Sequence, residues 1–211
     1  MSGQSPRPNW KPEVQLVSIT PKAEEVVETA YRNCWQSAPK EPGDGSRRIF
    51  IKKLIGKGHH SCLEFAFATF SIEGSRAFTH QLVRHRMASY AQESQRYVKI
   101  TNDRTYVVPP KIAENQETLE LYQAALDGCR SCYQALLDRG ISKQDARFVL
   151  PNAVRNTIIV GMNFRSWRHF LALRCDRHAQ WEIRSAAMDI LQILYDHAPS
   201  IFEDIHRTFS E

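Results

Sequence analysis

The chain has 211 residues, of which 42% are hydrophobic and 24% are charged, and its formal net charge is +5 at pH 7. This length suits one domain with a real core, and the composition is that of a soluble globular protein rather than a disordered one. No apolar run approaches the roughly 18–20 residues that a membrane span requires. The modest positive charge fits anionic small molecules and, by itself, also fits RNA.

Residues 1–12 are polar and contain prolines, without the apolar segment of a secretory signal. We therefore expect a flexible N-terminal arm over 1–12, followed by a single domain over 13–211. The five cysteines are an odd number in a chain too large to need disulfides, which favours reduced thiols in a cytoplasm. Cys129 and Cys132 have redox-motif spacing but lie in a long helical pattern, so we interpret them as packing residues.

Hydrophobic periodicity and turn residues predict the elements in chain order. Thr20 is expected to cap the first helix, and Pro199 to end the last one. Strands joined through local turns favour an antiparallel sheet. The expected strands are 13–19, 63–72, 95–100, 105–108 and 154–162, and the expected helices are 23–35, 47–57, 75–83, 111–139, 142–149, 166–174 and 179–197.

The stretch 84–97, RHRMASYAQESQRY, concentrates three arginines and a histidine among hydroxyl and amide side chains. Guanidinium groups offer forked donors that suit phosphate or carboxylate. Arg84, His85 and Arg86 are consecutive, so they cannot all face one way on a regular element, and a core could not bury them unpaired. Charge chemistry alone favours an anion-binding site, with a structural cluster of ion pairs as the alternative.

The segment 59–64, HHSCLE, holds the next candidates. Adjacent histidines rarely point into one site, so at most one is expected to be functional, and a lone histidine is more often structural. Only His59 and His60 stand near Cys62 in sequence to lower its pKa, so we assign Cys62 no catalytic role. Arg147 alone would more often be a surface residue.

Three segments together strongly resemble the flavin-dependent thymidylate synthases. The signature R-H-R, seven residues, then S-Q-R-Y occupies 84–97, Gly-His with a following Leu-Glu occupies 58–64, and LRCDRHAQWE occupies 173–182. The resemblance runs in order over nearly the whole chain. It implies an α+β fold with an antiparallel sheet flanked by helices, assembled as a homotetramer with sites shared between subunits.

By this resemblance the chain methylates dUMP to dTMP, with 5,10-methylenetetrahydrofolate as carbon donor, FAD as hydride carrier and NADPH as reductant. Reductive methylation needs a hydride carrier that side chains cannot supply, so the protein contributes position and charge. No GxGxxG fingerprint is present, so Rossmann-type binding of FAD is not expected. We expect no nucleic-acid or membrane partner, and a cytoplasmic location.

The resemblance also implies the site residues. Arg174 faces the uracil ring, where an always-charged planar guanidinium would stabilise an ionised ring nitrogen. The other implied dUMP residues are Gln81, Leu82, Val83, Arg84, Gln92, Glu93, Ser94, Gln95, Arg96 and Arg147. The implied FAD residues are Ser61, Arg84, His85, Arg86, Gln92, Asn163, Phe164, Arg165, His169 and His178, supported by His59 and Glu64. No metal is expected.

The sequence departs from the family pattern at a few positions. Ala91 replaces the usual Asn or Ser, Gln92 stands where many members carry Glu, and His169 stands where an Asn commonly meets the flavin. Ser94 is given a binding role, because no base stands beside it in sequence.

Two functions of other classes are weaker alternatives. An RNA-binding module is supported by the basic balance and by Tyr90 and Tyr97 near arginines, but no RNA-binding signature is present. A metal-dependent hydrolase lacks any His/Asp spacing typical of ligands.

Overall fold

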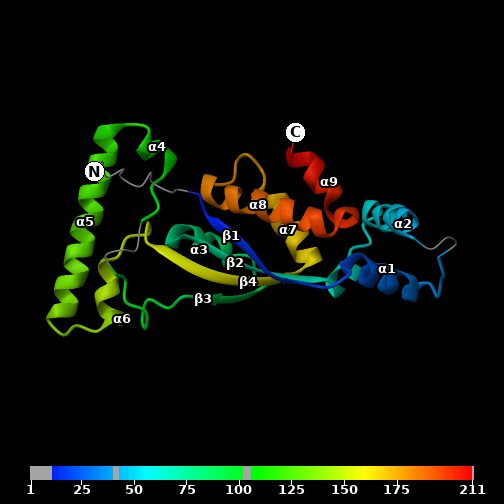
Figure 1. The fold of residues 1–211 in the computed structure, drawn as a ribbon, viewed down its shortest axis with the longest axis horizontal. Coiled ribbons are helices and arrows are strands. Elements are labelled where there is room, and N and C mark those ends of the chain that lie inside the picture. The colour runs from blue at the N-terminus through cyan, green and yellow to red at the C-terminus, as the bar shows by residue number, and fades with distance from the viewer. Residues whose placement is uncertain (1–10, 40–42, 102–105, 211) are drawn as a thin grey trace, which may run out of the picture. The chain divides into compact units, whose positions relative to one another are not determined.

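The computed structural model describes residues 11–39, 43–101 and 106–210 (Figure 1). Of the predicted arm 1–12, only Lys11 and Pro12 are among the described residues. No described helix combines the length and the apolar character needed to cross a membrane.

The elements come in the following order along the chain. The strands are β1 (Glu13–Ile19), β2 (Phe67–Ser75), β3 (Ser89–Gln92) and β4 (Arg155–Asn163). The α-helices are α1 (Ala23–Cys34), α2 (Asp44–Gly56), α3 (Arg76–Leu82), α4 (Pro110–Ala113), α5 (Gln116–Asp138), α6 (Lys143–Ala146), α7 (Phe164–Arg174), α8 (Trp181–His197) and α9 (Pro199–Ser210). The 3-10 helices are η1 (Ser61–Phe65) and η2 (Arg147–Val149).

The described strands form one four-stranded antiparallel sheet in the order β1-β2-β4-β3, flanked by helices, so the predicted α+β class is confirmed. The chain divides into two compact units. Unit 1 takes the described residues of 1–13, 73–84 and 91–158, and unit 2 those of 14–72, 85–90 and 159–211.

For most strongly periodic segments, the predicted first and last residues agree with the structure to within two positions. The strands 13–19 and 154–162 correspond to β1 and β4, and the helices 23–35, 75–83 and 179–197 correspond to α1, α3 and α8. The helix predicted over 166–174 corresponds to α7, and the one predicted over 47–57 begins three residues earlier, as α2. Local pattern is sufficient at these places because the buried face repeats at the period of the element.

Three predicted strands differ from the structure. The strand predicted over 63–72 begins later, as β2, because its first three residues belong to the 3-10 helix η1. In η1 the neighbours Cys62 and Leu63 are both buried, which strand alternation does not allow. The strand at 95–100 is wrong, because the backbone N–H groups of Tyr97 and Val98 both donate to the Ser94 carbonyl and form a turn. The segment 105–108 lies partly outside the described residues, and its Tyr106 forms an isolated antiparallel bridge with Val154.

The predicted helix 111–139 is two helices, α4 and α5. The Asn115 side-chain oxygen accepts from the backbone N–H groups of Glu117 (2.8 Å) and Thr118 (3.2 Å), and so begins α5 afresh. The predicted helix 142–149 is likewise divided into α6 and η2. The predicted end at Pro199 is confirmed, since α8 ends at His197. Pro199 also begins α9, a helix that was not predicted, because the first helical position needs no N–H donor.

Thr20 was wrongly predicted as a helix cap. Its hydroxyl accepts from the Phe67 N–H at 2.9 Å, and its own N–H donates to the Phe67 carbonyl at 2.9 Å. The N-cap of α1 is Lys22, in the left-handed region at φ 49°, without a side-chain cap. Thr20 therefore joins the end of β1 to the start of β2.

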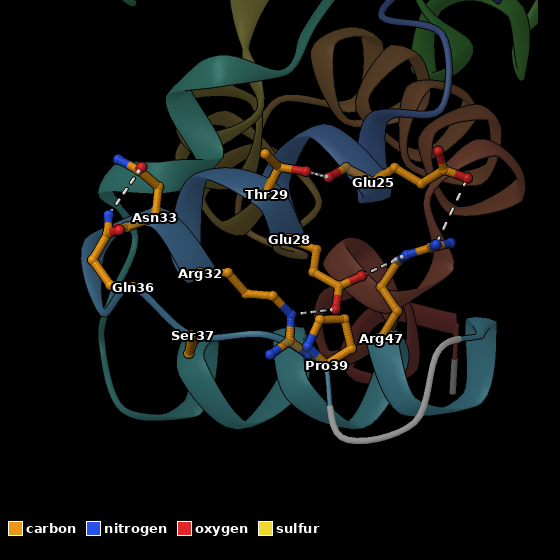
Figure 2. A pocket seen from close by; sticks show the side chains of 9 residues that line it. All are labelled: Glu25, Glu28, Thr29, Arg32, Asn33, Gln36, Ser37, Pro39 and Arg47. Carbon is orange, nitrogen blue, oxygen red and sulfur yellow. Dashed lines mark hydrogen bonds and ion pairs between the residues drawn. The ribbon is translucent and has the colours of Figure 1, made fainter.

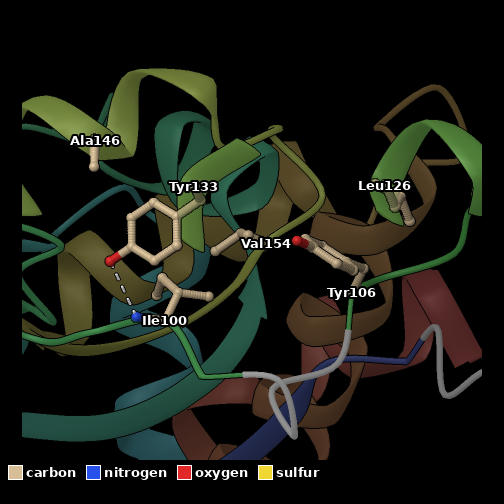
Figure 3. Packing of buried hydrophobic residues seen from close by; sticks show 6 residues of the cluster. All are labelled: Ile100, Tyr106, Leu126, Tyr133, Ala146 and Val154. Carbon is tan, nitrogen blue, oxygen red and sulfur yellow. Dashed lines mark hydrogen bonds between the residues drawn. The ribbon is translucent and has the colours of Figure 1, made fainter. Parts of the chain in front are cut away.

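The core of unit 1 lies between α5, α6 and the chain leading into β4 (Figure 3). Leu126 and Tyr133 of α5 pack in one cluster with Ile100, Ala146 and Val154. The Tyr133 hydroxyl accepts from the Ile100 N–H at 3.3 Å, which satisfies both groups inside the cluster.

The core of unit 2 is aromatic. Trp167 of α7 is fully buried, packs edge-to-face on Phe70 at 5.2 Å and donates its indole N–H to the Ala68 carbonyl at 3.0 Å. Phe164 packs on Phe202 of α9 at 5.1 Å. Within this unit, α7, α8 and α9 pack in succession and α2 packs on α9 (Figure 1). These contacts fix α7, whose last residue is Arg174.

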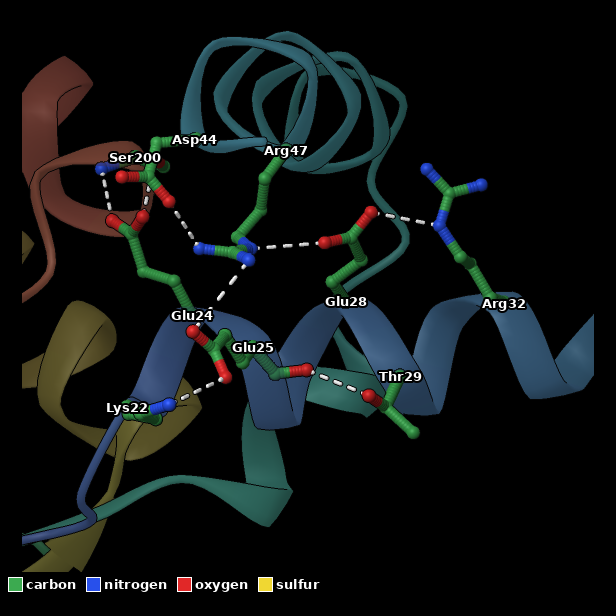
Figure 4. A network of polar contacts seen from close by, with 9 residues as sticks. All are labelled: Lys22, Glu24, Glu25, Glu28, Thr29, Arg32, Asp44, Arg47 and Ser200. Carbon is green, nitrogen blue, oxygen red and sulfur yellow. Dashed lines mark hydrogen bonds and ion pairs between the residues drawn. The ribbon is translucent and has the colours of Figure 1, made fainter. Parts of the chain in front are cut away.

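Helices α1 and α2 of unit 2 are joined by charged side chains (Figure 4). Glu28 accepts from Arg32 at 2.7 Å and from Arg47 at 2.9 Å, and these three side chains are at most 17% exposed. Arg47 also pairs with Asp44 at 2.7 Å, and the Arg32 guanidinium lies 4.1 Å over the ring of Phe50. Removing one partner from such a largely buried network lowers the free energy of unfolding by more than a surface ion pair adds to it.

Candidate functional site

Arg174, predicted to face the uracil ring, is held by His85 in unit 2. The Arg174 Nε donates to Nε2 of His85 at 3.0 Å, across 89 residues of sequence. The His85 ring packs edge-to-face on buried Phe170 at 4.9 Å and lies 6.3 Å from the ring of His169. The structure therefore brings together residues from the first and third segments of the resemblance.

His85 is neutral at pH 7. Burial first, then the charges of Arg174 and His169, lower the pKa of His85 to about 4. Because Nε2 accepts the Arg174 hydrogen bond, we assign the ring proton to Nδ1. The Arg174 guanidinium therefore lies beside a neutral acceptor. The imidazole of His85 fixes the orientation of the guanidinium through the bond to Nε.

We expect the free energy of unfolding to fall between pH 6.5 and pH 4 because of His85. In the unfolded chain the pKa of His85 returns to 6.5, whereas in the folded chain it is about 4, so in this window the unfolded state binds the extra proton. The stabilisation is complete above pH 6.5 and is lost as the pH falls, by about 2 kcal/mol between pH 7.5 and pH 5. Urea unfolding of wild type and His85→Gln at both pH values measures it, and equal pH slopes would contradict it.

Arg165 and Glu64, from the FAD and supporting sets, form an ion pair in unit 2. The Arg165 Nη1 lies 2.6 Å from the Glu64 carboxylate, and both side chains are about half exposed, at 54% and 47%. Ser61, at the start of η1, is also exposed. His178 is exposed and bonds Asp176 through its backbone N–H and its Nδ1, both at 2.8 Å.

Two further FAD candidates have structural partners. The Asn163 side-chain oxygen accepts from the Ser166 N–H at 2.8 Å and so caps α7. The Phe164 side chain is fully buried, and its N–H donates to the Ala66 carbonyl at 2.8 Å. Both residues position the start of α7, and their contact with a flavin stays a prediction.

The chemistry of these donors fits an anionic dinucleotide. Arg86, Arg165 and His178 are exposed N–H donors in unit 2. Guanidinium groups pair well with phosphate because their planar forks match its oxygens. These residues suit FAD, which carries a pyrophosphate, without the fingerprint of a Rossmann fold.

Gln92, predicted to contact both dUMP and FAD, is hydrogen-bonded inside unit 1. Its amide nitrogen donates to Thr79 Oγ1 at 2.7 Å and to Oδ1 of buried Asn156 at 2.6 Å. The Asn156 amide donates in turn to the Glu93 carbonyl at 3.2 Å, and the Glu93 N–H donates to the Thr157 carbonyl at 2.9 Å. These bonds set the path of the chain that leads to Ser94.

The remaining dUMP candidates of unit 1 differ in exposure. Leu82 and Gln95 are buried, so a ligand would meet their backbone more readily than their side chains. Arg96 is exposed, its N–H donates to the Ser94 hydroxyl at 3.3 Å, and its guanidinium lies 5.6 Å from the centre of the Tyr97 ring. Gln81, Val83 and Arg84 lie at the end of α3 or just beyond it.

Arg76 is a residue of unit 1 that the sequence reasoning missed. Burial first, and then the charge of Arg147, lower the pKa of Arg76, and burial followed by the charge of Arg76 lowers the pKa of His80. Cationic groups brought together in this way favour an anion. The signal in the sequence is the spacing of four between Arg76 and His80, which places both on one face of a helix.

The two buried cysteines have raised pKa values. Burial raises the pKa of Cys175 to about 12, and burial followed by the neighbouring Cys34 raises that of Cys62. A protonated thiol is a poor nucleophile.

We therefore expect Cys62→Ala and Cys175→Ala to keep substantial activity, within about threefold of wild type, since packing loss at one small side chain is modest. The measurement is formation of the product that the family resemblance implies, per bound FAD. A Cys62→Ala protein that binds FAD and dUMP yet makes no dTMP would indicate a covalent thiol mechanism.

A hollow of about 500 Å³ between α1 and α2 holds none of the predicted site residues (Figure 2). Its charged side chains, Glu25, Glu28, Arg32 and Arg47, pair with one another. We therefore do not assign it as the site. Among the described residues, no group of three or more His, Cys, Asp or Glu is arranged to hold a metal ion.

Comparisons with known proteins agree on one family. The family model described as "Thymidylate synthase complementing protein" matches residues 15–200. The chain is 43% identical over 198 residues to the flavin-dependent thymidylate synthase of Geobacter sulfurreducens, covering 90% of this chain and 85% of that protein. It is 46% identical over 188 residues to that of Pyrococcus furiosus, covering 85% and 77%. The chain belongs to the flavin-dependent thymidylate synthase family.

Proposed function

We propose that this chain converts dUMP to dTMP, with FAD as cofactor, 5,10-methylenetetrahydrofolate as carbon donor and NADPH as reductant. The observation that carries the proposal is the Arg174–His85 hydrogen bond, because the family resemblance assigns Arg174 to the uracil ring and this bond sets the direction of its guanidinium. Membership of the family supports the reaction.

Arg174 would bind the pyrimidine and stabilise negative charge on it. Its Nε is occupied by His85, so the outer guanidinium nitrogens offer the donors for a planar acceptor edge. A guanidinium stays charged throughout, and so it favours the ionised over the neutral ring nitrogen. His85, being neutral, accepts the Nε–H bond and so orients Arg174.

The phosphate of dUMP would bind the arginines of unit 1. Arg84, Arg96 and Arg147 come from the family pattern, and we add Arg76 because its pKa is lowered by burial and by Arg147. A dianionic phosphate relieves the repulsion between such cations. Gln81 and Ser94 complete the set, Ser94 as a binding residue.

FAD, when bound, supplies the hydride chemistry. Ser61, Arg86, Arg165 and His178 would hold it, and the ion pair of Arg165 with Glu64 would orient the guanidinium. Gln92 and His169 complete the proposed contacts. We further propose one catalytic domain over 13–211 and a cytoplasmic homotetramer with sites shared between subunits.

An absorption spectrum of the purified protein tests the function. We expect flavin bands that bleach on addition of NADPH without oxygen, and formation of dTMP when dUMP and 5,10-methylenetetrahydrofolate follow. Omission of each co-substrate in turn is the control. A flavin-free protein that cannot be loaded with FAD, or one that reduces flavin but makes no dTMP, would contradict the proposal. Flavin binding would also exclude the RNA-binding module as the main function.

A further inference from the structure

Two cysteines lie side by side in unit 2 with their thiols unoxidised. Cys34 is the last residue of α1 and Cys62 lies in η1, and their sulfur atoms are 3.9 Å apart across 28 residues of sequence. Cys34 is exposed, whereas Cys62 is buried at 4% exposure.

We propose that Cys34 and Cys62 are a redox-modification site that forms a reversible intramolecular disulfide. A disulfide has an S–S length of about 2.05 Å, so the sulfurs must approach by roughly 2 Å, which rotation of a side chain at a helix end can supply. Cys34 occupies such an end, since the chain leaves the helix at Trp35 and turns through Gln36 at φ 45°.

The chemistry requires an oxidant, and a small-molecule disulfide such as oxidised glutathione is the class that fits. The exposed Cys34 thiolate attacks one sulfur of the small disulfide and expels one small thiol, which leaves a mixed disulfide. The Cys62 thiolate then attacks the Cys34 sulfur and expels the second small thiol. Overall, the two protein thiols lose two electrons and two protons. The small disulfide takes these up and becomes two small thiols.

The order of attack follows from the surroundings of each thiol. Burial first, then the hydrogen bond and the charge of Cys34, raise the pKa of Cys62, so Cys62 is the poorer first nucleophile. A mixed disulfide on Cys34 removes the thiol and its charge, and with them those two contributions. The short separation then makes the second step intramolecular.

The site lies beside residues that the proposed function uses. The Tyr31 hydroxyl, from α1, donates to the His59 carbonyl, and the Trp35 ring packs edge-on to the His59 ring at 5.8 Å. Ser61 is the neighbour of Cys62 in η1. A disulfide would therefore tie α1 covalently to the segment 59–62, whereas its formation does not depend on the proposed function.

Disulfide mapping of the full-length protein tests the proposal. Tryptic cleavage places the five cysteines on five peptides, 33–40, 58–76, 112–130, 131–139 and 175–177. After incubation of the native protein with oxidised glutathione and alkylation of free thiols, we expect a cross-linked pair of 33–40 with 58–76. Cys132 is also exposed and can form its own glutathione adduct, so the readout is taken from the mapped peptides and not from the total thiol count. Cys34 and Cys62 should lose their alkyl label together, and dithiothreitol should restore both.

Cys62→Ala and Cys34→Ser are matched variants. Cys62→Ala should stop at a glutathione adduct on Cys34, and Cys34→Ser should react at neither position in the native state. A wild-type protein that keeps glutathione on Cys34 without the cross-link, that cross-links only between chains, or that pairs Cys129 with Cys132 instead would overturn the proposal. None of these outcomes depends on dTMP synthesis, so failure of the proposed function remains distinguishable.

Discussion

Arg174→Lys should lower kcat by about 100-fold, the equivalent of roughly 3 kcal/mol, because a planar charge-assisted fork is replaced by a point charge. Arg174 serves two partners in the proposal, His85 through Nε and the uracil through its outer nitrogens. A lysine ammonium keeps the charge but has no fixed fork, so it cannot hold both in place.

The measurement is dTMP formation per bound FAD, with flavin absorbance as the second readout. FAD content should change little, because the proposed flavin contacts are other residues. Arg177→Lys is the matched control, since Arg177 is exposed, lies three residues away and has no proposed role. An Arg174→Lys variant with a turnover near that of wild type would show that the guanidinium does not activate the uracil.

Mixing two inactive variants, Arg96→Ala and Arg165→Ala, should restore about one quarter of wild-type activity in a symmetric assembly with shared sites. This holds if each site takes the stretch around Arg96, here called the first block, and the stretch around Arg165, the second block, from different subunits. Arg96 belongs to unit 1 and Arg165 to unit 2. In a random equal mixture, one site in four receives an intact first block from one variant and an intact second block from the other.

The experiment dissociates and reassembles the two variants together and measures dTMP formation. Each variant reassembled with itself is the control and should remain inactive. Native mass spectrometry must show mixed tetramers, and mixed tetramers without added activity would count against sites shared between these blocks. A monomer that is fully active on a sizing column would remove the shared-site proposal altogether.

Local pattern was sufficient for elements whose burial repeats along the chain. β1 alternates largely between exposed and partly buried positions, and α8 buries Ile183, Ala186, Ile190 and Leu194 at helical spacing. The three segments that carry the family resemblance are short and contiguous in sequence. They could therefore be identified without knowing any tertiary contact. The family itself, confirmed by the comparisons, was therefore available from the sequence.

Local pattern failed where a residue has a distant partner. Thr20 resembles a helix cap, but its hydroxyl accepts from Phe67, 47 residues away, so strand pairing decides its role. Pro199 marks the end of α8 as predicted, but the helix α9 that it begins was not predicted. The start of α9 is anchored by the Ser200 N–H and hydroxyl, which both donate to Glu24, 176 residues away. Propensity is a weak guide once a tertiary hydrogen bond is formed.

The sequence by itself determined the fold class, the family and the set of charged side chains available to bind anions, because these follow from periodicity and from contiguous motifs. Only the tertiary structure decided that His85 orients Arg174, that the charge of Arg147 lowers the pKa of Arg76, and that Cys34 meets Cys62. Each pair joins residues that are 28 or more positions apart. A local pattern contains no information on such contacts, since they depend on how the elements pack.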